Sequence, residues 1–167
     1  MTQAIEWLKA RAPGFNQLSK DELNAVTDFS LLWTFFESRI LNRSGSAAAI
    51  CVAVDSWDAA GILVPDLLDE ELAYFKQRYH PVGHFSHHFD GLHLRPRDRA
   101  PMVRGVLSGA ETSPHQCVAT ALIIVFRYRN NLFHGEKWEY ALADQLGNFT
   151  NANRILMKVL DRYANLP

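Results

Sequence analysis

The stretch that decides the fold covers residues 113–135 and reads SPHQCVATALIIVFRYRNNLFHG. Ser113 followed by Pro114 places a capping residue before a proline at the first helical position, so a helix is predicted to begin there and to run to about Phe133. Gly135 supplies its C-terminal stop. Because the middle of this helix reads LIIVF, we expect a long apolar helix.

The last turns of this helix carry an unusual set of polar side chains. Arg127, Arg129, Asn130, Asn131 and His134 follow directly on the apolar run. Guanidinium, carboxamide and imidazole groups beside apolar residues must be paired, solvated or used in chemistry, because an unsatisfied buried polar group is costly. This cluster is therefore the first candidate for a functional site. The alternative is a structural ending, in which the histidine caps carbonyl groups and an arginine pairs with a carboxylate.

The segment from Arg129 to His134 resembles the signature of the HEPN superfamily, which is an arginine, four to six intervening residues and a histidine, often with a polar residue directly after the arginine. Asn130 supplies that polar residue. The resemblance implies a helical bundle that forms a homodimer, so that two copies of the motif meet in a metal-independent endoribonuclease site. Many such proteins are RNA-cleaving toxins, with an antitoxin or partner subunit, or phage-defence effectors. Other members are non-catalytic modules that bind a nucleotide, RNA or a partner protein.

Two arginines fit the motif. Six residues separate Arg127 from His134, and on an ideal helix these two lie near one face, whereas Arg129 is rotated by about 140° from His134. Arg129 is preferred because a polar residue follows it directly and because a long side chain at a fraying helix end can make up the angle. Arg127 is then a supporting residue, or a solvated or ion-paired surface arginine.

RNA cleavage gives each residue of the motif a chemical role. A 2′-hydroxyl that attacks the adjacent phosphorus needs proton removal, charge stabilisation on the non-bridging oxygens and protonation of the leaving 5′-oxygen. His134, near the negative end of a helix dipole, suits general acid catalysis, and Arg129 suits a forked contact with the phosphate. Asn130, four residues before His134, is expected to hold the imidazole ring. The second subunit supplies a second histidine.

The rest of the chain predicts further helices and no strands. Ser19 and Glu22 form a capping-box pattern that begins a helix over 19–41, and other helices are predicted over 47–60, 68–79 and, from a heptad-like seam, 142–163. Prolines and glycines cut residues 80–112 into an irregular insertion with one short helix. We therefore expect one domain, residues 1–167, with an all-α fold, an antiparallel bundle of four to five main helices.

Three further residues have supporting roles in this hypothesis. Glu37, at the polar end of the helix over 19–41, is a candidate partner for the Arg129 guanidinium, and a solvent-exposed glutamate at a helix end is the alternative. Asn153 occupies one position of the seam, where it fixes register, satisfies a neighbour or faces the polar cluster. Asn131 belongs to the motif itself.

The insertion is locally basic and rich in histidine. A basic segment with interleaved aromatic residues is a candidate for holding a single-stranded RNA backbone, and a surface loop that packs on the bundle is the alternative. His84 and His88, four residues apart, raise a metal-dependent hydrolase as a third hypothesis, but nearby glycines weaken the helix that such a site needs, so no metal is expected. The four candidate RNA-binding arginines are Arg95, Arg97, Arg99 and Arg104.

Composition limits where the protein acts and what it binds. A net charge of −1 excludes a global basic field, so RNA must be held locally. Cys51 and Cys117 have no paired spacing, which favours a reducing, cytoplasmic location. The first residues lack the features of a signal peptide, and no stretch has the length and apolarity of a membrane span, so a soluble protein without membrane contact is expected. No cofactor is expected.

Overall fold

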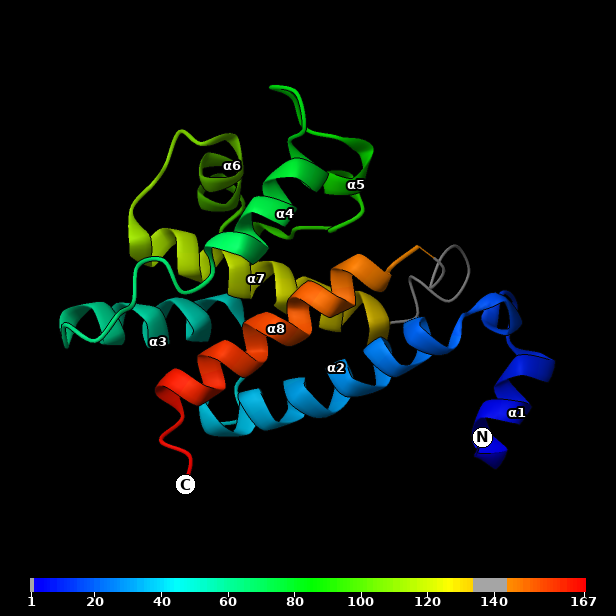
Figure 1. Cartoon of the computed structure of the whole chain (residues 1–167). Coiled ribbons are helices and arrows are strands. Elements are labelled where there is room, and N and C mark those ends of the chain that lie inside the picture. Colours follow the sequence, from blue (N-terminus) through cyan, green and yellow to red (C-terminus); the bar gives the residue numbers. More distant parts are fainter. Residues whose placement is uncertain (1, 134–143) are drawn as a thin grey trace.

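The computed structural model describes residues 2–133 and 144–167, which contain helices and no strand (Figure 1). The prediction of an all-α fold is confirmed. No helix within the described ranges is long and apolar enough to cross a membrane. The α-helices are α1 (Gln3–Arg11), α2 (Lys20–Arg39), α3 (Ala47–Ala59), α4 (Asp69–Tyr79), α5 (His87–Asp90), α6 (Ala100–Ser108), α7 (Pro114–Phe133) and α8 (Leu146–Tyr163), and the short 3₁₀ helices are η1 (Phe15–Gln17) and η2 (Pro96–Asp98).

Helix α7 forms the centre of the core. It begins at Pro114, as predicted, and every residue from Val118 to Tyr128 is buried. The Phe126 ring lies 6.0 Å from the Trp33 ring of α2, and the Tyr128 ring lies 6.1 Å from the Phe149 ring of α8, measured between ring centroids. An apolar helix that is covered on all sides removes a large apolar area from water, which accounts for the stability of the domain around it.

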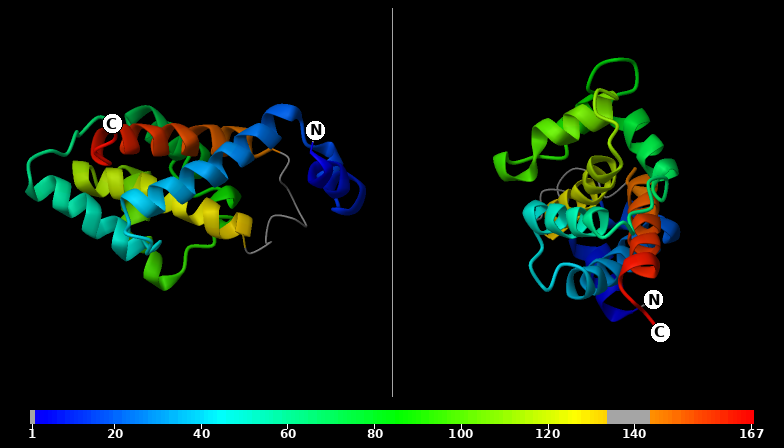
Figure 2. Two further views of the ribbon diagram at one scale, coloured as in Figure 1. Left: turned by 90° about the horizontal axis from the view of Figure 1, so that it is seen from below. Right: turned by 90° about the vertical axis from the view of Figure 1, so that its left-hand side faces the viewer.

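Helices α2 and α8 lie side by side and run in the same direction, opposite to α7 (Figures 1 and 2). Near the start of both helices, the Asp144 amide donates a hydrogen bond of 3.0 Å to the Glu22 carboxylate. The Phe29 and Phe149 rings then pack 5.1 Å apart. The prediction of an antiparallel bundle is therefore wrong for this pair. The two helices are not consecutive, so no short connection forces them to run in opposite directions.

The start of α2 matches its sequence signature. The Ser19 hydroxyl accepts a hydrogen bond of 3.2 Å from the Glu22 amide, and the Glu22 carboxylate accepts one of 2.8 Å from the Ser19 amide. These two contacts form the predicted capping box, which satisfies amides at the free end of the helix. The hydrogen bond from the Ser19 amide lowers the pKa of Glu22 below its ordinary value of 4.5.

Replacing Glu22 with glutamine is expected to reduce the loss of stability in acid. Because the folded-state pKa of Glu22 is lowered, its ionised carboxylate stabilises the native state at a pH above the ordinary pKa, and this contribution is lost as the pH falls through the lowered value. The effect should be below about 1 kcal/mol because the cap is near solvent. Urea unfolding at neutral and acidic pH measures it, with Asp21→Asn as the control. Equal acid sensitivity of wild type and Glu22→Gln would contradict the expectation.

The segment over residues 80–112 is more regular than predicted. It contains α5, η2 and the nine residues of α6, whereas one short helix was expected. Pro101 lies in the first turn of α6, where a missing amide is tolerated, and Gly109 ends the helix with a φ of 81°. At Gly105, an added Cβ would lie 3.3 Å from the Glu111 Cβ, so the missing side chain permits close packing. The prolines and glycines here begin, pack and end a helix instead of preventing one.

Candidate functional site

The candidate motif occupies the last turns of α7, and its final residues His134 and Gly135 lie outside the described residues. Arg129 is partly buried. Its Nη1 donates a hydrogen bond of 2.9 Å to Oδ1 of Asn130, and its guanidinium carbon lies 5.4 Å from the centroid of the Phe133 ring. Its Nε is buried without a hydrogen-bond partner among the described residues, and none of the ion pairs there includes it. Within the described residues, the positive charge of Arg129 therefore has no carboxylate partner.

Arg127, the second candidate for the motif arginine, is tied into the core. It is 1% exposed, and its Nη1 lies 3.2 Å from Oδ2 of Asp98. Its Nε donates a hydrogen bond of 3.0 Å to the Leu92 carbonyl, and its Nη2 donates one of 3.3 Å to Oδ1 of Asn131. Asn131 in turn donates to the Gly91 carbonyl at 3.1 Å. Both side chains therefore hold residues 91–98 against α7. The expected position of Arg127 on the surface is wrong. Its expected ion pair with a carboxylate is found.

Asn130 has one hydrogen-bond partner that was not predicted. Its side-chain oxygen accepts the hydrogen bond from Arg129, and the residue is 8% exposed. A hydrogen bond between Asn130 and the His134 ring stays a prediction, because His134 lies outside the described residues. In the described part of the site, Asn130 fixes the direction of the Arg129 guanidinium.

Two predicted supporting residues lie away from the motif arginine. The Glu37 carboxylate accepts a hydrogen bond of 2.9 Å from Nε1 of Trp33 and another of 2.9 Å from the Gly45 amide. It closes the turn between α2 and α3, so the expected ion pair with the motif arginine is wrong. Asn153 donates a hydrogen bond of 3.0 Å from Nδ2 to the Ala25 carbonyl. It satisfies a neighbour on α2, which was one of the predicted alternatives.

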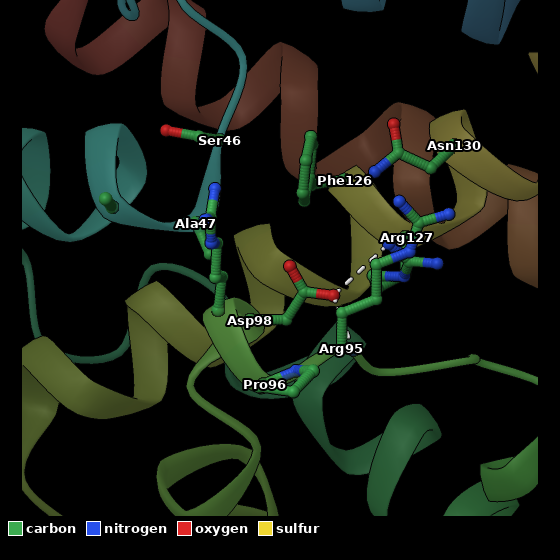
Figure 3. A pocket seen from close by; sticks show the side chains of 10 residues that line it. Ser46, Ala47, Arg95, Pro96, Asp98, Phe126, Arg127 and Asn130 are labelled. Atoms are coloured by element: carbon green, nitrogen blue, oxygen red, sulfur yellow. Dashed lines mark hydrogen bonds and ion pairs between the residues drawn. The ribbon is translucent and has the colours of Figure 1, made fainter.

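A pocket of about 610 Å³ lies beside the motif, between α7, η2 and the start of α3 (Figure 3). Phe126 and Asn130 of α7 line one side, while Ser46 and Ala47 lie across from them. Two of the four predicted RNA-binding arginines, Arg95 and Arg97, also line it. The contribution of α3 was not predicted, because nothing in the sequence indicates that residues 46–48 approach residues 95–98. The charged lining residues are Arg95, Arg97, Asp98 and Arg127.

The other two predicted RNA-binding arginines are not among the lining residues of this pocket. The Arg104 guanidinium lies 4.9 Å from the ring centroid of Phe85 and 4.6 Å from that of Phe89. These cation–π contacts place Arg104 in the packing of the insertion itself. Arg99 precedes α6 with a left-handed backbone, at a φ of 56°.

The histidines of the insertion do not assemble a metal site among the described residues. Nδ1 of His84 lies 3.3 Å from the Val82 carbonyl, and the rings of His87 and His88 lie 4.0 Å apart. Residues 2–133 and 144–167 contain no group of three or more His, Cys, Asp or Glu side chains that could hold a metal ion. The structure thus gives no geometric support to the metal-dependent hypothesis.

Tyr128 directly precedes Arg129 on α7. Its hydroxyl shares a hydrogen bond with the hydroxyl of Tyr79, and both residues are buried. Burial raises the pKa of each hydroxyl above its ordinary value. Both tyrosine hydroxyls therefore stay protonated near neutral pH.

Neither a protein-family model, nor a curated protein, nor a solved structure matches this chain. The functional interpretation therefore depends on the motif and on the geometry around it.

Proposed function

We propose that this protein is a metal-independent endoribonuclease of the HEPN type. The observation that carries the proposal is the environment of the Arg129 guanidinium. A partly buried guanidinium without a carboxylate partner among the described residues, held by Asn130 at 2.9 Å, suits a forked contact with a phosphate. The positive charge of Arg127 is neutralised by the Asp98 carboxylate, so Arg129 is the better candidate for the motif arginine.

The proposed reaction is an attack of the RNA 2′-hydroxyl on the adjacent phosphorus. The 2′-oxygen forms a bond to phosphorus while the bond from phosphorus to the 5′-oxygen breaks, which leaves a 2′,3′-cyclic phosphate and a 5′-hydroxyl. His134 of one subunit accepts the proton of the 2′-hydroxyl, and His134 of the second subunit protonates the 5′-oxygen. Arg129 stabilises the charge on the non-bridging oxygens.

The proposal includes an arrangement of subunits and a biological role. The helices around α7 form a HEPN-type bundle, and a homodimer brings two copies of the end of α7 to one cleft. Such a ribonuclease acts in the cytoplasm as a toxin or phage-defence effector, where an antitoxin or partner subunit restrains it. A site that uses an imidazole and a guanidinium needs no metal ion.

Incubation with single-stranded RNA in excess EDTA tests the function. We expect cleavage to continue, since neither Arg129 nor His134 depends on a metal, and we expect the products to carry 2′,3′-cyclic phosphate and 5′-hydroxyl ends. The same oligonucleotide with 2′-deoxyribose at the cleaved position is the control and should remain intact. Cleavage that stops in EDTA, or that proceeds at 2′-deoxyribose, would contradict the proposed mechanism.

The pocket beside Asn130 favours a second candidate function, a non-catalytic HEPN module that binds RNA or a nucleotide. Arg95 and Arg97 line this pocket, and an arginine-lined pocket serves binding equally well without turnover. Tight binding of RNA without any cleavage product, in the presence or absence of EDTA, would select this alternative.

A further inference from the structure

The pocket beside the motif carries an excess of positive charge. Arg127 is offset by Asp98, whereas Arg95 and Arg97 take part in no ion pair of the described residues. Three guanidinium groups and one carboxylate line the pocket, which leaves a net charge of +2. Guanidinium groups gathered in one concave site repel one another, and an anion in that site relieves the repulsion.

Polar donors face the same space. Asn130 is 8% exposed and lines the pocket, yet its amide nitrogen donates no hydrogen bond to the described residues. This nitrogen can therefore donate a hydrogen bond to a ligand in the pocket. Figure 3 shows this side chain on the α7 side of the pocket, above Arg127.

The first turn of α3 supplies further donors across the pocket. The Ser46 hydroxyl accepts from the Ala49 amide at 3.1 Å, and the Ser46 carbonyl accepts from the Ile50 amide at 3.0 Å. The amides of Ala47 and Ala48, which also line the pocket, form no hydrogen bond within the described residues. Together with Asn130 and the arginines, this helix start suits an anion.

We propose that this pocket binds a backbone phosphate of the single-stranded RNA substrate, next to the phosphate that Arg129 contacts. This inference rests on the proposed function. Asn130 connects the two positions, because its oxygen accepts from Arg129 while its side chain lines the pocket. A volume of about 610 Å³ exceeds the needs of a simple ion and fits a phosphate together with its nucleoside. Arg95 and Arg97 hold this second phosphate.

The double variant Arg95→Ala/Arg97→Ala tests the pocket when RNA binding is measured without turnover. In a His134→Ala background, we expect this double variant to bind a fluorescent single-stranded RNA oligonucleotide about tenfold more weakly. The slope of log K against log salt should become shallower by about 0.7, the loss of one phosphate contact. The matched control is Arg11→Ala/Arg154→Ala, which removes the same charge from two exposed positions outside the pocket. Equal losses in the two double variants would overturn the inference.

Ala48→Glu provides a second test that does not depend on removing arginines. Ala48 is exposed at the start of α3 and lines the pocket, and a carboxylate in the first turn of a helix is compatible with folding. The introduced carboxylate should occupy the anion site and weaken RNA binding to a similar extent. Wild-type affinity for RNA in Ala48→Glu would overturn the inference.

Free nucleotide and cleavage assays separate the possible failures. If ATP binds in the pocket while Arg95→Ala/Arg97→Ala leaves RNA affinity at the level of the control, the pocket serves a nucleotide and the RNA assignment is wrong. If RNA binding depends on the pocket but the protein with intact His134 cleaves nothing, the inference holds and the nuclease proposal fails. If cleavage proceeds in EDTA but RNA affinity does not depend on the pocket, the nuclease proposal holds and this inference fails.

Discussion

Arg129→Ala is expected to lower the rate of RNA cleavage by about 10²–10³-fold, which is the usual effect of removing one group that stabilises transition-state charge. The fold should be nearly unaffected. Arg129 contacts Asn130 and Phe133 on its own helix and takes part in no ion pair among the described residues. The measurements are single-turnover cleavage of an RNA oligonucleotide in EDTA and urea unfolding of the same preparation.

Two variants make the Arg129 result interpretable. Arg129→Lys keeps the charge but loses the forked geometry, so its cleavage rate should lie between those of wild type and Arg129→Ala. His134→Ala should lose cleavage to a similar extent, since it removes the proposed acid and base. Wild-type cleavage by Arg129→Ala would refute the assignment of this residue. A large loss of stability in Arg129→Ala would indicate a structural role instead.

The sequence predicted the positions of the helices near the site along the chain better than it predicted which side chains contact one another. The Ser19 capping box and the start of α7 at Pro114 depend on residues only a few positions apart, and both are found. The predicted cap by Ser113 is wrong, because its hydroxyl accepts no hydrogen bond from the α7 amides among the described residues. The predicted stop at Gly135 lies outside the described residues. Such local signals act within one turn of a helix. Helix α1 was not predicted, because it buries no residue fully and has only a weak apolar pattern.

The polar contacts of the site could not be predicted from spacing along the chain. Arg127 pairs with Asp98 and Asn131 binds the Gly91 carbonyl, and these partners are separated by 29 and 40 positions. The predicted partner of the motif arginine, Glu37, is instead bound to the Gly45 amide. A charge pattern identifies groups that need partners, but only the packing of the helices decides which groups meet.

Helix directions were also beyond the sequence pattern. Apolar spacing shows which face of a helix is buried, and it carries no information about the direction of a neighbour that is distant in the chain. The sequence therefore could not show that α2 and α8 run in the same direction, which differs from the predicted antiparallel bundle (Figure 1). This arrangement places their starts close to the end of α7, where the candidate motif lies.

Arg127→Ala is expected to destabilise the fold by about 3–5 kcal/mol, which is typical for the loss of one partner of a buried ion pair. Arg127 is 1% exposed and Asp98 is 5% exposed. The substitution leaves the Asp98 carboxylate without its cation and removes the donor to the Leu92 carbonyl. Because folded domains are stable by only about 5–15 kcal/mol, the variant should unfold at a much lower urea concentration. Urea unfolding at neutral pH measures this difference, and Arg154→Ala, on the exposed side of α8, should change stability by less than about 0.5 kcal/mol.

The double variant Arg127→Met/Asp98→Asn separates the two causes of that loss. It removes the cation and the buried negative charge together, while an asparagine oxygen can still accept from the Arg95 amide, as Asp98 does at 2.8 Å. Its free energy of unfolding should therefore exceed that of Arg127→Ala, because no uncompensated charge remains in the core. A cost of Arg127→Ala below about 1 kcal/mol, the level of an exposed ion pair, would mean that water reaches the pair. In that case Arg127 could also bind the phosphate. The motif arginine would then be Arg127, or both arginines together, instead of Arg129 alone.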